Sequence, residues 1–156
     1  MKKITLLLIL SLVFAVTCKK EQKVEKSVSF VDLQDGAEVV SPVKVRLQVT
    51  GMQVAPAGEV KEGTGHFLIV VDGPDFFEAG QVIVIPSDEK YIHLAKGETE
   101  VEINLPPGEH TLTAQFADGE HKSYGQPLAK KIKVVVKESK EESKGQEKNN
   151  FYNVRR

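Results

Sequence analysis

The chain has 156 residues, a formal net charge of −1, 40% hydrophobic residues and 28% charged residues, a composition typical of one globular domain with polar tails. Without excess positive charge there is no basic field to recruit nucleic acid, and 6% aromatic residues with no Trp argue against a base-stacking platform. The single cysteine excludes an internal disulfide and a cysteine-based zinc cage.

Residues 1–17 are predicted to be a signal peptide that forms a short helix. Lys2 and Lys3 precede an apolar run from Ile4 to Val16, which is shorter than the roughly 20 residues of a membrane-spanning helix. The run ends at Ala15-Val16-Thr17-Cys18, which resembles the lipobox of bacterial lipoproteins. We therefore expect a lipidated Cys18, a polar tether over residues 18–26, and a domain anchored to a bacterial envelope membrane on its periplasmic or extracellular side. The alternatives are an ordinary secretory signal cut nearby and an uncleaved anchor, both of which also export the domain.

The first predicted strands lie between residues 28 and 50. A short strand from Val28 to Leu33 is followed by the turn signal Asp35-Gly36. From Val43 to Val49 every second residue is apolar, which predicts a strand with one face on a core. Residues 51–63 contain Gly, Ala and Pro with little periodicity, and this predicts a long loop.

The central strand is predicted from Gly65 to Asp72. Its five consecutive apolar residues, 67–71, are rich in β-branched side chains and are bounded by glycines, which indicates a strand buried on both faces. Another short strand is expected from Gln81 to Ile85, and a brief extended segment from Tyr91 to Leu94.

Alternating patterns predict three further strands, at residues 99–105, 110–116 and 132–136. The Pro106-Pro107-Gly108 corner and the Asp118-Gly119 turn separate them. The predicted fold is an all-β, antiparallel, immunoglobulin-like β-sandwich of about seven or eight strands over residues 27–137. Residues 138–156 are expected to be a charged, disordered tail, which ends either in a frayed terminus or in a short docking peptide that begins at Phe151.

Five motifs, in chain order, resemble a known family. They are Ser41-Pro42-Val43-Lys44-Val45, residues 51–58, Gly63-Thr64-Gly65-His66, Ile92-His93-Leu94 with residues 96–100, and residues 105–112. Together they resemble the bacterial domain of unknown function 4399 family over about residues 28–136. The resemblance implies an exported single-domain β protein and supplies no reaction.

The chain departs from that family in its histidines. Members of the family often carry consecutive histidines where this chain has His66-Phe67-Leu68, a His-rich loop at residues 118–122, and a further His at the position of Tyr91. If the family binds a metal through those histidines, this chain has lost several candidate ligands.

Four histidines are present, and they fall into two kinds. His110 is in phase with the apolar residues of its strand, so we expect it to be a structural corner residue that bonds the backbone of the Pro-Pro-Gly corner. For His66 and His93, which begin short extended segments, two interpretations stay open. In the first, both rings form hydrogen bonds with buried loop carbonyls. In the second, they bind copper or zinc together with His121 and with Asp118 or Glu120.

The sequence contains no nucleophile elbow, no zinc-protease motif, no phosphate-binding loop and no dinucleotide fingerprint. We therefore expect a protein that is not an enzyme and has no required cofactor. The first functional prediction is a non-catalytic binding or adaptor module with an envelope protein as its partner. The alternative is a histidine-based copper or zinc protein of the envelope.

Overall fold

A computed structural model describes residues 24–138. The predicted signal peptide and Cys18 lie outside these residues, as do the predicted tether before residue 24 and the predicted charged tail after residue 138. Within them the chain forms nine strands and one short 3₁₀ helix. The strands are β1 (Ser27–Phe30), β2 (Ala37–Val40), β3 (Val43–Thr50), β4 (Gln53–Val54), β5 (Thr64–Val71), β6 (Tyr91–Leu94), β7 (Glu100–Ile103), β8 (Gly108–Ala117) and β9 (Ala129–Lys137). The helix η1 spans Gln126–Leu128.

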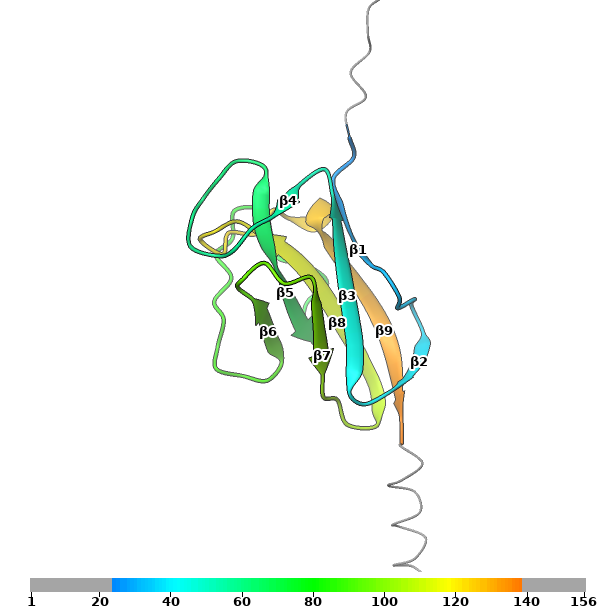
Figure 1. Cartoon of the computed structure of the whole chain (residues 1–156). Helices are drawn as coiled ribbons and strands as arrows, with labels where there is room; N and C mark the ends of the chain where they lie inside the picture. The colour runs from blue at the N-terminus through cyan, green and yellow to red at the C-terminus, as the bar shows by residue number, and fades with distance from the viewer. Residues whose placement is uncertain (1–23, 139–156) are drawn as a thin grey trace, which may run out of the picture.

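The strands form two sheets that share one hydrophobic core (Figure 1). The smaller sheet has the order β1-β3-β7, and the larger has the order β2-β9-β8-β5-β4, with β6 paired to β5. Alternate residues of each sheet enter the core between them, for example Val45 and Leu47 from β3, and Phe67 and Phe116 from β5 and β8. The period-2 pattern of β3 arises because only one face of this strand lies on the core.

Strand β5 is buried on both of its faces, as its continuous apolar sequence predicts. Its odd-numbered residues face the main core, and its even-numbered residues Leu68 and Val70 face the opposite side of the sheet. On that outer face Leu68 and Val70 pack with Ile83 of the connection between β5 and β6. We call this side of the larger sheet the outer face.

A buried glutamine holds the connection in place on the outer face. Gln115 accepts a hydrogen bond from the amide of Phe77 through Oε1 and donates through Nε2 to the carbonyls of Gly125 and Leu128. Thr113 donates to the carbonyl of Pro74. Because these polar side chains are satisfied, they can be buried without a large desolvation cost.

The all-β prediction is confirmed, and the patterns predicted at residues 43–49 and 65–72 correspond to β3 and β5. The expectation of wholly antiparallel sheets is wrong for two pairs, because β2 lies parallel to β9 and β4 lies parallel to β5. Neither β2 nor β4 was predicted, which is why the described strands outnumber the seven or eight expected.

The predicted strand from Gln81 to Ile85 is also wrong. This segment runs beside residues 121–123 but forms only the isolated bridge between Val82 and Lys122. The opposing residue His121 has a φ of 65°, which is incompatible with an extended ladder. Among residues 24–138 no helix has the length and hydropathy that a membrane span requires.

Candidate metal centre

Strand β5 positions the first histidine of the site. His66 pairs with Ala117 of β8 and lies two residues before Leu68, so its side chain is on the outer face of the larger sheet. Its exposed fraction is 1%. Gly65 makes this close packing possible, because a Cβ there would lie 2.3 Å from the carbonyl oxygen of Ala117.

The two other histidines come from β6 and from the turn after β8. His93 pairs with Leu68 of β5, and paired residues in a sheet project to the same face, so His93 also lies on the outer face. His121 belongs to the turn Asp118–Lys122, which we call the histidine turn, and it adopts the left-handed conformation. Both side chains are partly buried.

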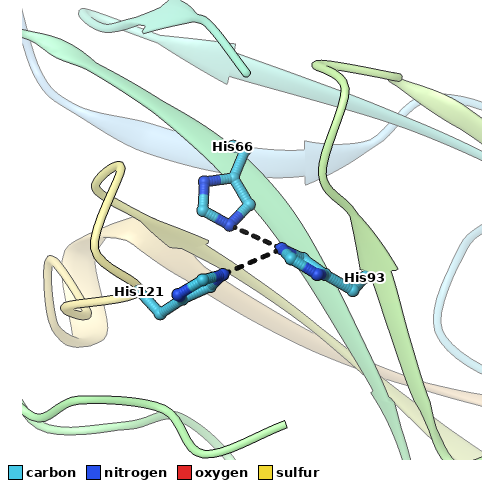
Figure 2. A group of neighbouring side chains, drawn as sticks. All are labelled: His66, His93 and His121. Atoms are coloured by element: carbon cyan, nitrogen blue, oxygen red, sulfur yellow. Dashed lines mark hydrogen bonds between the residues drawn. The ribbon is translucent and has the colours of Figure 1, made fainter. Parts of the chain in front are cut away.

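The three rings converge on one point (Figure 2). His93 Nε2 lies 3.0 Å from His66 Nε2 and 3.1 Å from His121 Nε2. The rings are inclined to one another by 55°, 61° and 89°, so none of them is stacked face to face. We call His66, His93 and His121 the histidine cluster.

No arrangement of protons gives each contact in the cluster its own hydrogen bond. The Nε2 atom of a neutral imidazole carries either one proton or one lone pair in the ring plane. His93 Nε2 faces two other Nε2 atoms, so its single proton or single lone pair must be shared between them. A metal cation at the point of convergence would instead accept all three lone pairs.

The surroundings of His66 and His93 favour the neutral form of these two rings, which is the form that binds metals. Burial is the main reason that the pKa of His66 falls to about 4, and the neighbouring His93 and His121 rings lower it further, against the charge of Asp118. Burial also lowers the pKa of His93, with His121 adding to this effect and Glu98 opposing it.

The separations suit a small transition-metal ion. Nitrogens bound to tetrahedral zinc at about 2.0–2.1 Å lie about 3.3 Å from one another. The two contacts of 3.0 and 3.1 Å are therefore within a few tenths of an ångström of that spacing, and all three ligand atoms lie within 4.8 Å of one another. Three imidazoles also match the ligand preferences of zinc and copper. His66, His93 and His121 would thus supply three imidazole ligands of a type that either metal accepts.

The other predicted site residues that the structure describes do not belong to the histidine cluster. Of the described Asp and Glu side chains none joins the cluster, and Asp118 Oδ1 instead accepts hydrogen bonds from the amides of Glu120 and Lys122. The carboxylate of Glu120 pairs with Lys122. His110 is at the Pro-Pro-Gly corner, where its ring bonds the carbonyl of Pro106 and the carboxylate of Asp72.

The interpretation in which His66 and His93 bond loop carbonyls does not match the structure. Among the described residues the Nε2 atoms of both rings face other imidazoles, and His66 Nδ1 is buried without any hydrogen-bond partner. The orientation of the His66 ring is therefore set by packing on the outer face.

Comparison with known proteins assigns the fold to a family without assigning an activity. The pattern of the family described as Domain of unknown function (DUF4399) matches residues 45–137, which is more than half of the chain. The chain belongs to this family. The match spans β5, β6 and the histidine turn, so all three members of the histidine cluster lie inside the family domain. No curated protein and no solved structure matches the chain significantly.

Proposed function

We propose that this member of the family binds a late first-row metal ion, zinc or copper, through His66, His93 and His121. The observation that carries the proposal is the convergence of three imidazole Nε2 atoms, two of them 3.0 and 3.1 Å from the third, with no complete hydrogen-bonding arrangement among themselves. A bound cation relieves this conflict.

The proposed role is non-catalytic and belongs to an exported, immunoglobulin-like sandwich that Cys18 anchors to the cell envelope. The basic and apolar pattern of residues 1–18 supports export. Near the cluster the hydroxyls of Thr64 and Ser123 donate to the carbonyls of Lys61 and Phe77, so neither is available there as an activated nucleophile.

Thermal unfolding of the untagged, full-length chain tests the metal proposal. After treatment with a chelator, the protein is melted alone, with zinc and with copper(II). A metal present at 100 times its dissociation constant is expected to stabilise the fold by about 2.7 kcal/mol. His93→Ala and His121→Ala are expected to abolish that gain, since each removes one of three ligands. His110→Ala is the control, because this histidine lies outside the cluster and should retain the gain.

The adaptor function is the alternative, and it predicts the opposite result. If neither metal raises the melting temperature of the wild-type chain, the metal proposal is wrong and the histidine cluster is structural. A shift with only one of the two metals identifies the ion.

A further inference from the structure

The histidine turn is organised by the side chain of its first residue. Asp118 Oδ1 accepts hydrogen bonds from the amides of Glu120 and Lys122, both at 2.9 Å. The backbone of Asp118 closes the same turn, because its amide donates to the carbonyl of Lys122 and its carbonyl accepts from the amide of His121. Asp118 therefore bonds the residue on each side of His121 as well as His121 itself.

His121 is held in a conformation that few residues other than glycine adopt. Its φ is 65°, which for an ordinary L-residue costs about 1–2 kcal/mol relative to the right-handed helical region. Its carbonyl accepts a hydrogen bond from the amide of Ile83, so neighbouring structure restrains the turn as well. This backbone conformation directs the imidazole toward His93 (Figure 2).

The turn is also fixed from its other side. Gly119 packs so closely on residue 59 that a Cβ would lie 2.1 Å from the carbonyl oxygen of Glu59. Its own carbonyl accepts a hydrogen bond from the amide of Gly58. The turn is thus clamped between the loop that precedes β5 and the connection that precedes β6.

We propose that Asp118 is the positioning residue for His121, so that its carboxylate oxygen acts on the turn and not on the metal. The proposal rests on the proposed metal-binding function. It follows from the bonds of Asp118 Oδ1 to two backbone amides and from the absence of this carboxylate from the ligand cluster within residues 24–138. Partners that orient metal ligands typically change metal affinity by about 10–100-fold when they are removed.

The test compares zinc affinities of the untagged full-length chain by competition with a chromophoric chelator. Asp118→Asn retains an oxygen that can accept both amides, and Asp118→Ala does not. We expect Asp118→Ala to lose about 10–100-fold in affinity and Asp118→Asn to bind much closer to wild type. Glu120→Gln is a matched control, since it removes a negative charge from the same turn without removing a bond to the backbone. Asp35→Ala is a second control, because the Asp35 carboxylate also accepts a hydrogen bond from a backbone amide, that of Lys133, and neither residue belongs to the histidine turn.

Two results would overturn the proposal. Equal losses in Asp118→Asn and Asp118→Ala would show that the charged carboxylate itself is required, and unchanged affinity in Asp118→Ala would show that the turn does not need it. Should Asp118→Ala fail to fold, Asp118→Ser takes its place, with an intermediate affinity expected because a hydroxyl can still accept one amide.

A measurement without metal separates this proposal from the proposed function. In the chelator-treated protein, nuclear Overhauser contacts between the His93 and His121 rings should persist in Asp118→Asn and disappear in Asp118→Ala. If the wild type binds no zinc, but the ring contacts persist in Asp118→Asn and disappear in Asp118→Ala, the metal function fails while the positioning role stands. If all variants keep the ring contacts, the positioning role fails.

Discussion

His66 combines near-complete burial with an ionisable ring. Its Nδ1 has no partner among the described residues, and its Nε2 contacts only another imidazole. Protonation would place an unpaired positive charge in the outer-face cluster beside two other histidines, and this explains the low pKa of about 4.

The metal-free protein is expected to lose stability as the pH falls from 6.5 to 4. In this window an unfolded His66 binds a proton and the folded one does not, so the free energy of unfolding decreases with falling pH. A pKa near 4 in place of 6.5 corresponds to about 3 kcal/mol in total. Urea titrations of wild type and His66→Gln, both with chelator, measure it. Plotted against pH, the free energy of unfolding of the wild type should have a steeper slope in this window than that of His66→Gln. The difference in slope should correspond to at most one bound proton. Parallel curves would contradict the assignment of the low pKa to His66.

His110 has a structural role and lies at the opposite end of β8 from the histidine turn. Its ring connects Pro106 of the corner to the carboxylate of Asp72 at the end of β5. Burial by itself would raise the Asp72 pKa, but the hydrogen bonds from the Thr111 amide and the His110 ring outweigh it and lower that pKa.

Replacing His110 by alanine should therefore destabilise the domain by about 1–3 kcal/mol, because two bonded groups lose a partner. The loss should be the same with and without zinc, as measured by chemical unfolding. Glu109→Ala, at an exposed neighbouring position, is the control and should have little effect. If His110→Ala were as stable as the wild type, the structural role of His110 at the corner would be contradicted.

At the scale of elements, the cluster exists because three segments meet on the outer face of the larger sheet. Strand β5 supplies His66, β6 supplies His93 through its pairing with Leu68, and the histidine turn supplies His121. The turn has no extended pairing of its own, so its position depends on close contact with the loop before β5.

Gly119→Ala tests this dependence. The added Cβ would collide with the backbone of Glu59, so the turn or the loop must move and carry His121 away from His93. We expect weaker zinc affinity by chelator competition, although the substitution touches no ligand. Gly36→Ala is the control: its φ of 80° makes alanine unfavourable by about 1–2 kcal/mol, but a Cβ there meets no atom within 4 Å. It should lower stability without changing affinity, and equal affinities in the two variants would contradict the clamp.

At the scale of the whole molecule, the histidine cluster and the start of the described chain lie at the same end. Ser27 pairs with Thr50, and Gln53 shortly afterwards pairs with Thr64 at the start of β5. Strand β9 ends at the other end of the sandwich (Figure 1). Five residues separate the predicted anchor Cys18 from Val24, and the six steps between the Cα atoms of Cys18 and Val24 can span at most about 20 Å. A lipid on Cys18 would therefore keep the cluster end close to the membrane.

We expect the wild-type protein, expressed in a bacterium that processes lipoproteins, to partition into the detergent phase of a detergent–water extraction. Cys18→Ala should move to the aqueous phase, because the acyl chains are the reason for partitioning. Zinc binding by the variant should be unchanged, since all three members of the histidine cluster lie within the folded domain. Recovery of both forms in the aqueous phase would leave an ordinary secreted protein.

The sequence alone predicted the all-β fold class, the approximate positions of β1, β3 and β5 to β9, and the four histidines worth testing. Alternation and continuous apolar runs report directly how many faces of a strand are buried, so β3 and β5 could be predicted from residues 43–50 and 64–71 alone. These local patterns contain no information about which strands are neighbours. The parallel pairs of β2 with β9 and of β4 with β5 were therefore not predictable, nor was the loss of pairing at residues 81–85.

Only the tertiary structure decided that His66, His93 and His121 meet and that Asp118 does not join them as a ligand. His66 and His93 are 27 residues apart, and His93 and His121 are 28 apart, so no short ligand spacing marks the cluster. Their meeting depends on the register of β6 against β5 and on a left-handed residue in a turn clamped by two other segments. Each of these is a long-range contact, whose geometry depends on packing across the whole sheet and not on the residues next to each histidine in the chain.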